Sequence, residues 1–139
     1  MDYQAIVYET EGEVGILTYN RPKMVNAINR KMLEELHDFW QARQRDFATR
    51  VIIVTGSGEK GFCSGLDMKS AMEFAPEGGP TGASIWEGQI HFSGIIRLMR
   101  SCPQPIIAAV HGPAMGAGLS FALAADVRLA SEDAFFCAQ

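Results

Sequence analysis

The chain has 139 residues, of which 47% are hydrophobic and 20% charged, and its formal net charge is −4. These values are typical of a soluble globular protein and suit one domain or part of one. The acidic balance and the lack of a basic stripe argue against a nucleic-acid partner.

The first elements along the chain are two apolar runs at residues 6–8 and 14–19. They predict strands joined by a turn at Glu11-Gly12, which is typical of a hairpin. Residues 30–46 predict an amphipathic helix, because their apolar side chains recur on one face at helical spacing. Asn29 is suited to cap the N-terminus of this helix.

The rest of the chain alternates β-branched runs with helical patterns, which points to an α/β architecture. The expected elements are a buried strand at 51–54, a Pro/Gly-rich loop at 75–83, a helix at 85–100, a second buried strand at 106–110, a helix of small residues at 116–125 and a third strand at 127–130. Pro103 and Pro105 follow the helix at 85–100 and prevent its continuation.

Cysteine usage and the N-terminus bear on the compartment. The three cysteines, Cys63, Cys102 and Cys137, form no CxxC pair and no cluster with histidine, so we expect reduced thiols and no metal site. Residues 1–4 lack the basic and apolar regions of a signal peptide. The longest apolar stretch, residues 106–110, is too short to span a bilayer. We therefore expect a cytoplasmic protein without a membrane partner.

Two turns rich in small residues are the most informative segments, at 61–68 and 111–120, and each follows an apolar run. In such turns backbone N–H groups can approach a ligand closely. Two of them facing one point would form an oxyanion hole, which stabilises negative charge on a carbonyl oxygen. Either turn alone could simply be a packing turn. A phosphate-binding loop is the competing interpretation of Gly116-Ala117-Gly118, but the Gly-Lys-Ser/Thr ending of a P-loop is missing and GxG alone is weak evidence for a dinucleotide.

Three blocks that include these turns resemble the enoyl-CoA hydratase/isomerase (crotonase) superfamily. They are residues 20–29 (NRPKMVNAIN), residues 51–56 continuing to 62–68 (VIIVTG and FCSGLDM), and residues 105–112 continuing through 116–118 to 124–130 (PIIAAVHG, GAG and AADVRLA). Their order and spacing match the family over essentially the whole chain, which is about half the usual length. The resemblance implies a single crotonase-like domain over residues 1–139, an apparently incomplete spiral of ββα units that represents the N-terminal part.

The resemblance also implies the site. The thioester carbonyl of an acyl-CoA would accept hydrogen bonds from the backbone N–H groups of Leu66 and Ala117. Residues 69–88, with Phe74 and Trp86, would border the acyl pocket, and Lys23 could contact phosphates. The residues implied in binding substrate and coenzyme A are Val25, Ala27, Ser64, Gly65, Leu66, Asp67, Met68, Gly116 and Ala117.

The chain departs from the family at the acid/base residues. Classical hydratases use two glutamates; the position of the first is Ser120 here, and the second would fall just beyond Gln139. A serine without a nearby base is a poor acid or base at neutral pH. Ser120 could orient a water or a substrate, or simply be a small residue on a packed helix.

Other polar residues have structural interpretations. We expect His111 to be hydrogen-bonded, Asp67 to shape and cap its turn, and Asp126 and Arg128 to form ion pairs or lie on the surface. Cys63 has no histidine close in sequence, so a nucleophilic role is unsupported.

The sequence thus predicts an acyl-CoA-processing enzyme that resembles enoyl-CoA hydratase/isomerase, works through an oxyanion-stabilised enolate and needs no metal or redox cofactor. The resemblance also implies a homo-oligomer, a trimer or a hexamer. One alternative is a non-catalytic or partner-dependent relative that binds CoA thioesters. Another is that these residues represent half of an ordinary enzyme.

Overall fold

The computed structural model describes residues 3–73 and 79–138. Its elements in chain order are β1 (Ile6–Glu11), β2 (Val14–Tyr19), η1 (Pro22–Met24), α1 (Arg30–Arg43), β3 (Val51–Gly56), α2 (Met68–Glu73), α3 (Gly82–Ser101), β4 (Ile106–Val110), β5 (Pro113–Met115), α4 (Ala117–Ala124), β6 (Val127–Ala130) and β7 (Phe135–Cys137). No helix among the described residues is long and apolar enough to cross a lipid bilayer.

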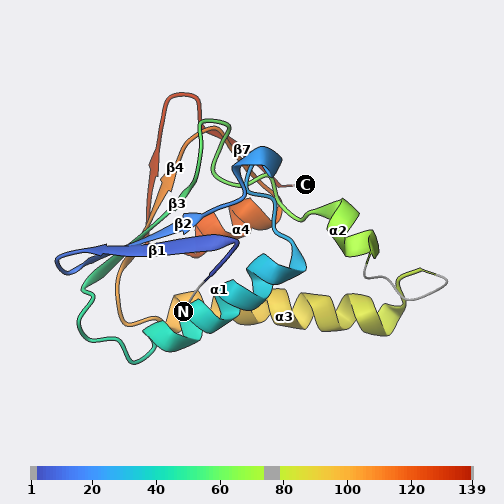
Figure 1. Cartoon of the computed structure of the whole chain (residues 1–139), viewed down its shortest axis with the longest axis horizontal. Helices are drawn as coiled ribbons and strands as arrows, with labels where there is room; N and C mark the ends of the chain where they lie inside the picture. Colours follow the sequence, from blue (N-terminus) through green and yellow to red (C-terminus); the bar gives the residue numbers. More distant parts are fainter. Residues whose placement is uncertain (1–2, 74–78, 139) are drawn as a thin grey trace.

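A five-stranded sheet organises the molecule, with strand order β1-β2-β3-β4-β6. β1 and β2 form the predicted antiparallel hairpin, and the remaining neighbours are parallel. β5 and β7 form a separate two-stranded parallel sheet. In Figure 1, α1 and α3 run along each other below the large sheet, and α4 lies close behind its strands. The predicted α/β architecture is therefore confirmed.

The core lies between the helices and one face of the large sheet. Alternate residues of each central strand point into it, as pleated strands require. The buried side chains include Leu17 and Tyr19 of β2, Ile52 and Val54 of β3, and Ile106, Ala108 and Val110 of β4. They meet the apolar face of α1, formed by Met32, Leu36, Phe39 and Trp40.

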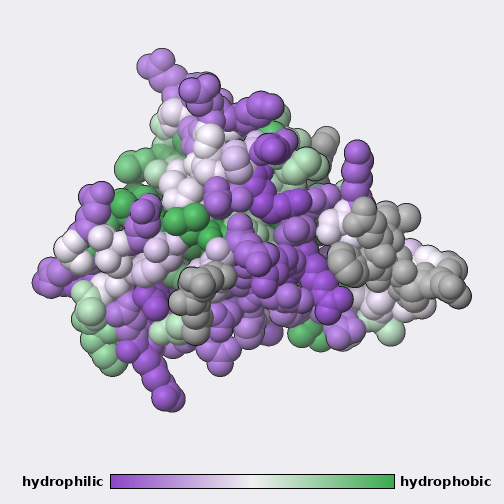
Figure 2. All heavy atoms as spheres, viewed as in Figure 1, coloured by the Kyte–Doolittle hydropathy of each residue, from purple (hydrophilic) through white to green (hydrophobic). Residues whose placement is uncertain are grey.

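The other face of the sheet carries β-branched side chains that are half-buried or, for Val127, exposed. Ile16, Ile53, Ile107 and Val127 stand in register across four neighbouring strands. Figure 2 shows hydrophobic surface gathered over the strands, whereas the helices below them are mostly hydrophilic. The parallel part of the sheet is thus fully covered on one face only, although parallel sheets are usually covered on both.

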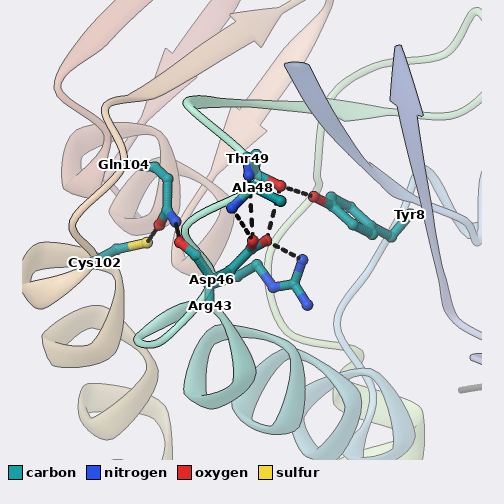
Figure 3. Close-up of polar contacts among 7 residues, drawn as sticks. All are labelled: Tyr8, Arg43, Asp46, Ala48, Thr49, Cys102 and Gln104. Atoms are coloured by element: carbon teal, nitrogen blue, oxygen red, sulfur yellow. Dashed lines mark hydrogen bonds and ion pairs between the residues drawn. The ribbon is translucent and has the colours of Figure 1, made fainter. Parts of the chain in front are cut away.

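The helix predicted at 30–46 ends earlier, at Arg43, because the chain turns around Asp46. The Asp46 carboxylate accepts hydrogen bonds from the backbone N–H groups of Ala48 (2.9 Å) and Thr49 (3.2 Å) and forms an ion pair with Arg43 at 2.7 Å. Figure 3 shows this cluster, in which the Thr49 hydroxyl also contacts the hydroxyl of Tyr8. Because these bonds satisfy backbone groups outside a helix, they compete with its continuation.

The segment after β3 also differs from the expectation. The helix predicted at 85–100 begins at Gly82, because Thr81 and Ser84 form a reciprocal capping box. Two residues of the expected loop at 75–83 are therefore helical, while residues 74–78 lie outside the described residues. The short elements α2, β5 and β7 were not predicted. β5 and β7 have three residues each, too few for a recognisable alternation.

Glu35 ties the start of the chain to α1. Its buried carboxylate accepts hydrogen bonds from the backbone N–H groups of Gln4 (2.9 Å), Ala5 (2.8 Å) and Ile6 (3.2 Å). Lys31 lies 3.6 Å from the same carboxylate. This side chain therefore fixes where β1 enters the sheet.

We expect Glu35→Gln to lower the free energy of unfolding by about 1–3 kcal/mol, because buried N–H groups lose a charged acceptor. Glu34→Gln is the matched control on the same helix; Glu34 forms an exposed ion pair with Arg30, so its effect should stay below about 0.5 kcal/mol. Urea denaturation of both variants measures the difference. Equal effects would contradict the anchoring role of Glu35.

Candidate active site

The two glycine-rich turns lie side by side and are joined by backbone hydrogen bonds. The Cys63 N–H donates to the Pro113 carbonyl, and the Met115 N–H donates to the Cys63 carbonyl, both at 2.9 Å. These bonds form a parallel bridge between Cys63 and Ala114. Upstream, the Phe62 N–H donates to the His111 carbonyl at 2.8 Å. The structure therefore brings together the two segments that the sequence analysis singled out.

Glycine is required where the turns touch. Gly65 has φ +95° and Gly116 has φ +49°, both in the region that favours glycine. A Cβ at Gly65 would lie 3.0 Å from the Met115 carbonyl oxygen and 3.8 Å from the Ala117 nitrogen. Glycine has no side chain to fill this space. The Gly65–Leu66 peptide can therefore lie directly against the start of α4.

The Leu66 N–H points away from the strand-like segment that holds its neighbours. Ile28 donates to the Gly65 carbonyl at 2.8 Å, and the Ile28 carbonyl accepts from Asp67 at 2.9 Å. In a parallel bridge of this kind, the residue in between directs its own N–H to the opposite side. Within residues 3–73 and 79–138, the Leu66 N–H has no hydrogen-bond acceptor.

The Ala117 N–H is likewise without an acceptor among the described residues. Ala117 is the first residue of α4, where backbone N–H groups have no partner within the helix. The helix dipole adds partial positive charge at this end. Two adjacent turns thus each present one free donor; their action on a substrate stays a prediction.

Ser120 lies one turn further along α4 and is half-buried. Its hydroxyl donates to the Gly116 carbonyl at 3.2 Å, and its backbone N–H donates to the same oxygen at 3.0 Å. The hydroxyl is therefore engaged with its own helix, and no base contacts it among the described residues.

The segment implied in binding coenzyme A lies beside the first turn. The Ser64 N–H donates to the Val25 carbonyl at 2.9 Å, and the Ser64 hydroxyl donates to the Met24 carbonyl at 3.2 Å. Val25 and Asn26 both have left-handed backbones, with φ +50° and +54°. For a β-branched residue such as Val25 this conformation is strained and is typical of functional loops.

Asn26 holds this strained loop, and the sequence analysis did not assign it a role. Its fully buried side chain accepts from the Arg21 N–H (2.9 Å) and donates to the carbonyls of Ser57 (3.0 Å) and Gly61 (2.9 Å). It therefore joins the loop to the start of the first turn. The signal available in the sequence was an asparagine within a Pro-containing loop, because asparagine tolerates the left-handed conformation.

Asp67 shapes the turn and caps α2, as predicted. One carboxylate oxygen pairs with Arg21 at 2.8 Å, and the other accepts from the Ser70 N–H at 3.2 Å. Arg21 also donates to the Ala27 carbonyl. The Arg21 hydrogen bond holds the pKa of the Asp67 carboxyl below its ordinary value of 3.8. Ala27 and Asp67 are thus linked through the Arg21 guanidinium.

The remaining polar candidates have structural roles. His111 donates from Nε2 to the Gly58 carbonyl at 2.8 Å. Asp126 pairs with Arg100 at 2.8 Å, and Arg128 donates to carbonyls at the end of α4. Burial raises the pKa of the Cys63 thiol to about 11, so it is protonated at neutral pH and unsuited to act as a nucleophile. Among the described residues, no group of three or more His, Cys, Asp or Glu is placed to hold a metal ion.

The surface around the two donors is open. Two hollows of about 500 and 340 Å³ lie elsewhere, one lined by β1 and α1 and the other by α1 and α3. Leu66 is 44% exposed, and Met68 and Trp86 are more exposed still. Residues 69–88 were expected to border the acyl pocket as a loop, but residues 69–73 belong to α2 and residues 82–88 to α3, and Phe74 lies outside the described residues.

Comparison with known proteins shows which sequences this chain resembles. A family model described as enoyl-CoA hydratase/isomerase matches residues 9–139. The crotonyl-CoA hydratase of Syntrophomonas wolfei is 38% identical, over 98% of this chain and 50% of its own length. The short-chain-enoyl-CoA hydratase of Clostridium acetobutylicum is 34% identical, over 98% of this chain and 50% of its own.

Solved structures agree. A crystal structure of an enoyl-CoA hydratase/isomerase from Xanthobacter autotrophicus is 37% identical, with a TM-score of 0.86 over 97% of this chain and 49% of its own. The crystal structure of an enoyl-CoA hydratase from Mycobacterium smegmatis is 28% identical and has a TM-score of 0.87, over 96% of this chain and 50% of its own. The predicted crotonase-like fold is confirmed, and the chain spans about half the length of these relatives.

The contact between the turns can be tested at Gly118, where an added Cβ would lie 2.5 Å from the Cys63 carbonyl oxygen. We expect Gly118→Ala to lower the free energy of unfolding by about 1–3 kcal/mol, because this backbone must move. Gly88→Ala is the control, a helical glycine with open space around it; it should stabilise the protein by about 0.5–1 kcal/mol. Thermal denaturation measures both, and a harmless Gly118→Ala would contradict the close contact.

The lowered pKa of Asp67 predicts that the free energy of unfolding depends on pH. Because its pKa is lowered in the folded state, its stabilising effect is complete above 3.8 and is lost as the pH falls through the folded-state pKa. We expect Asp67→Asn to lower the free energy of unfolding at pH 7 by about 1–2 kcal/mol and to reduce the loss of stability on acidification. Glu9→Gln, at an exposed carboxylate of β1, is the control. Parallel pH profiles for the wild type and Asp67→Asn would refute the effect of the ion pair.

Proposed function

Since the chain belongs to the enoyl-CoA hydratase/isomerase family, we propose that it forms the oxyanion-hole part of an enzyme that acts on acyl-CoA thioesters. The observation that carries this proposal is the pair of acceptor-free N–H groups at Leu66 and Ala117, on turns in direct contact. The thioester carbonyl oxygen would accept hydrogen bonds from both.

The chemistry follows from where negative charge develops. When the α-carbon loses a proton, or the β-carbon of an enoyl group is attacked, charge moves onto the thioester oxygen as an enolate forms. Fixed backbone donors stabilise that charge without having to reorganise. The N-terminus of α4 adds partial positive charge at the same point. This step requires no particular side chain at Leu66 or Ala117.

Coenzyme A would lie along the strained loop and the first turn. Main-chain groups of Val25 and Ala27, and of residues 64–68, would contact its adenine and pantetheine parts. Lys23, on η1, is available for a phosphate. The loop is suited to this because Asn26 and Arg21 hold it rigidly, so little conformational entropy remains to be lost on binding.

The reaction we infer is that of an enoyl-CoA lyase or isomerase in fatty acid metabolism. Ser120 makes a classical two-glutamate hydration unsuited to these residues alone, because its hydroxyl is bonded to Gly116 and lacks a base. The acid/base carboxylate would come from a segment other than residues 1–139. Relatives include a protein named 3-hydroxyisobutyryl-CoA hydrolase, at 29% identity, so the same oxyanion hole is compatible with another reaction.

We further propose a cytoplasmic homo-oligomer, a trimer or a hexamer, without a resident cofactor. The resemblance to the family supports this proposal. The alternative function is binding of CoA thioesters without turnover. The Ser120–Gly116 hydrogen bond favours it, because this bond removes the hydroxyl as a free catalytic group.

Proline at Ala117 removes one donor, and the first turn of a helix tolerates proline. In protein that also contains the segment supplying the carboxylate, we expect Ala117→Pro to lower kcat/KM for crotonyl-CoA by about 10²–10³-fold, the usual effect of losing one oxyanion donor. Ala117→Gly keeps the N–H and should stay within a few-fold of the wild type. Steady-state assays with circular dichroism separate lost activity from lost fold.

Calorimetric titration with crotonyl-CoA, on protein in which residues 1–139 are joined to the segment that supplies the carboxylate, distinguishes the two functions. Binding together with turnover that depends on the Ala117 N–H supports the enzyme. Binding without turnover supports the alternative. Full activity in a folded Ala117→Pro variant would overturn the oxyanion role of this residue.

A further inference from the structure

One guanidinium joins the segment proposed to bind coenzyme A to the segment that carries the Leu66 donor. Arg21 lies directly before η1, and its Nη2 atom is 2.8 Å from Asp67 Oδ2 in the first turn, residues 61–68. Its Nη1 atom donates to the Ala27 carbonyl in the strained loop, residues 25–28. Each terminal nitrogen of the guanidinium therefore already has a partner within the protein.

Backbone hydrogen bonds join the same loop and turn on both sides of the Leu66 donor. The Ser64 N–H donates to the Val25 carbonyl at 2.9 Å. Ile28 forms a parallel bridge with Leu66, closed by two hydrogen bonds of 2.8 and 2.9 Å to the residues on either side of Leu66. The Leu66 peptide is thus bonded to the loop before and after the donor, so a movement of the loop would move the donor with it.

The loop needs side-chain support because its backbone is strained. Val25 and Asn26 follow one another in the left-handed region, with φ +50° and +54°, a conformation that costs free energy for residues other than glycine. The Arg21 N–H donates to the Asn26 side chain at 2.9 Å, and the Arg21 guanidinium binds the next carbonyl, that of Ala27. Without these contacts we expect the loop to relax toward ordinary dihedral angles.

The ion pair between Arg21 and Asp67 is shielded from solvent. The two side chains are 20% and 7% exposed, so salt and water screen the pair less than they screen a surface pair. The planar guanidinium can donate to a carbonyl and a carboxylate at the same time, whereas the lysine ammonium is a compact point charge. A lysine at this position would therefore keep the charge but lose the bridge between loop and turn.

We propose that Arg21 is a positioning residue that sets the place of the Leu66 N–H by holding the strained loop against the first turn. The inference rests on the proposed function, because it concerns the same acyl-CoA site. Binding of the coenzyme part to the loop then presents the thioester to a donor that is already fixed, which keeps the cost of reorganisation small. The Ala117 donor belongs to α4 and makes no contact with Arg21.

The test measures coenzyme binding and thioester polarisation separately. Residues 1–139 are joined to the segment that supplies the carboxylate, as the wild type and as Arg21→Lys. Calorimetry with coenzyme A alone measures the affinity of the loop. Infrared spectroscopy of bound butyryl-CoA, labelled with a heavy carbon isotope at the thioester carbonyl, measures how far hydrogen bonding lowers the C=O stretching frequency. Butyryl-CoA has no double bond to hydrate or to shift.

We expect Arg21→Lys to weaken coenzyme A binding by about tenfold, the usual scale for a lost hydrogen bond to a charged group. The lowering of the C=O frequency should fall to about half of the wild-type value, because one of the two oxyanion donors is displaced. A purely structural role of Arg21 would lower the melting temperature without changing the C=O frequency in folded, ligand-bound protein.

Arg100→Lys is the matched control. The Arg100 guanidinium likewise donates to a backbone carbonyl, that of Ala124 at 3.0 Å, and pairs with the Asp126 carboxylate at 2.8 Å. Arg100 lies at the end of α3, outside the loop and the first turn, so both readouts should match the wild type. Circular dichroism shows that each variant is folded at the temperature of measurement. If Arg21→Lys unfolds, Asp67→Asn, which removes the same ion pair, takes its place.

Two results would overturn the proposal alone. One is a wild-type value of either readout in folded Arg21→Lys, because loop and turn would then not depend on Arg21 together. The other is an equal loss in Arg100→Lys, because the effect would not be specific to this contact. If the wild type itself leaves the C=O frequency of bound butyryl-CoA unchanged, the oxyanion-hole proposal fails and this inference fails with it.

Discussion

The parallel bridge between Cys63 and Ala114 is the contact on which the rest of the site depends. It holds two turns that are about fifty residues apart in the chain, and it does so entirely through backbone groups. Gly118 packs under Cys63 at a distance that leaves no room for a side chain. The start of α4 is therefore fixed against the Gly65–Leu66 peptide, and the two free N–H groups are held in place before any ligand arrives.

A buried polar network supports this arrangement from the other side. Asn26 connects the strained loop to Ser57 and Gly61, while Arg21 reaches Asp67 in the first turn. Each buried polar group in this network is hydrogen-bonded, as a low-dielectric interior demands. Substitutions at Asn26 would therefore disturb the loop and the turn together, although Asn26 need not touch a ligand.

The candidate site combines backbone donors with a helix, α4, that carries no carboxylate. Leu66 and Ala117 each present a backbone N–H without an acceptor among the described residues, and donors of this kind stabilise the charge that develops on a thioester enolate. On α4, the Ser120 hydroxyl bonds to its own helix.

The periodicity of apolar residues was sufficient to predict the longer strands and helices. The β-branched runs at β3 and β4 and the apolar face of α1 follow directly from side-chain periodicity, and so does the hairpin of β1 and β2. Boundaries set by side chains were missed, because Asp46 stops α1 and Thr81 starts α3 through hydrogen bonds that periodicity does not report. The three-residue strands β5 and β7 were missed because each exists only by pairing with the other.

The sequence by itself determined the family, the strands, the helices and the two candidate donor turns, because residue type and spacing control local backbone conformation. Only the tertiary structure decided that the turns touch, that Asn26 and Arg21 hold the loop, and that β6 pairs with β4 at the end of the sheet. Those features depend on contacts between residues far apart in the chain. Distances such as the 3.8 Å from the Gly65 Cβ position to the Ala117 nitrogen arise only when the whole sheet is assembled.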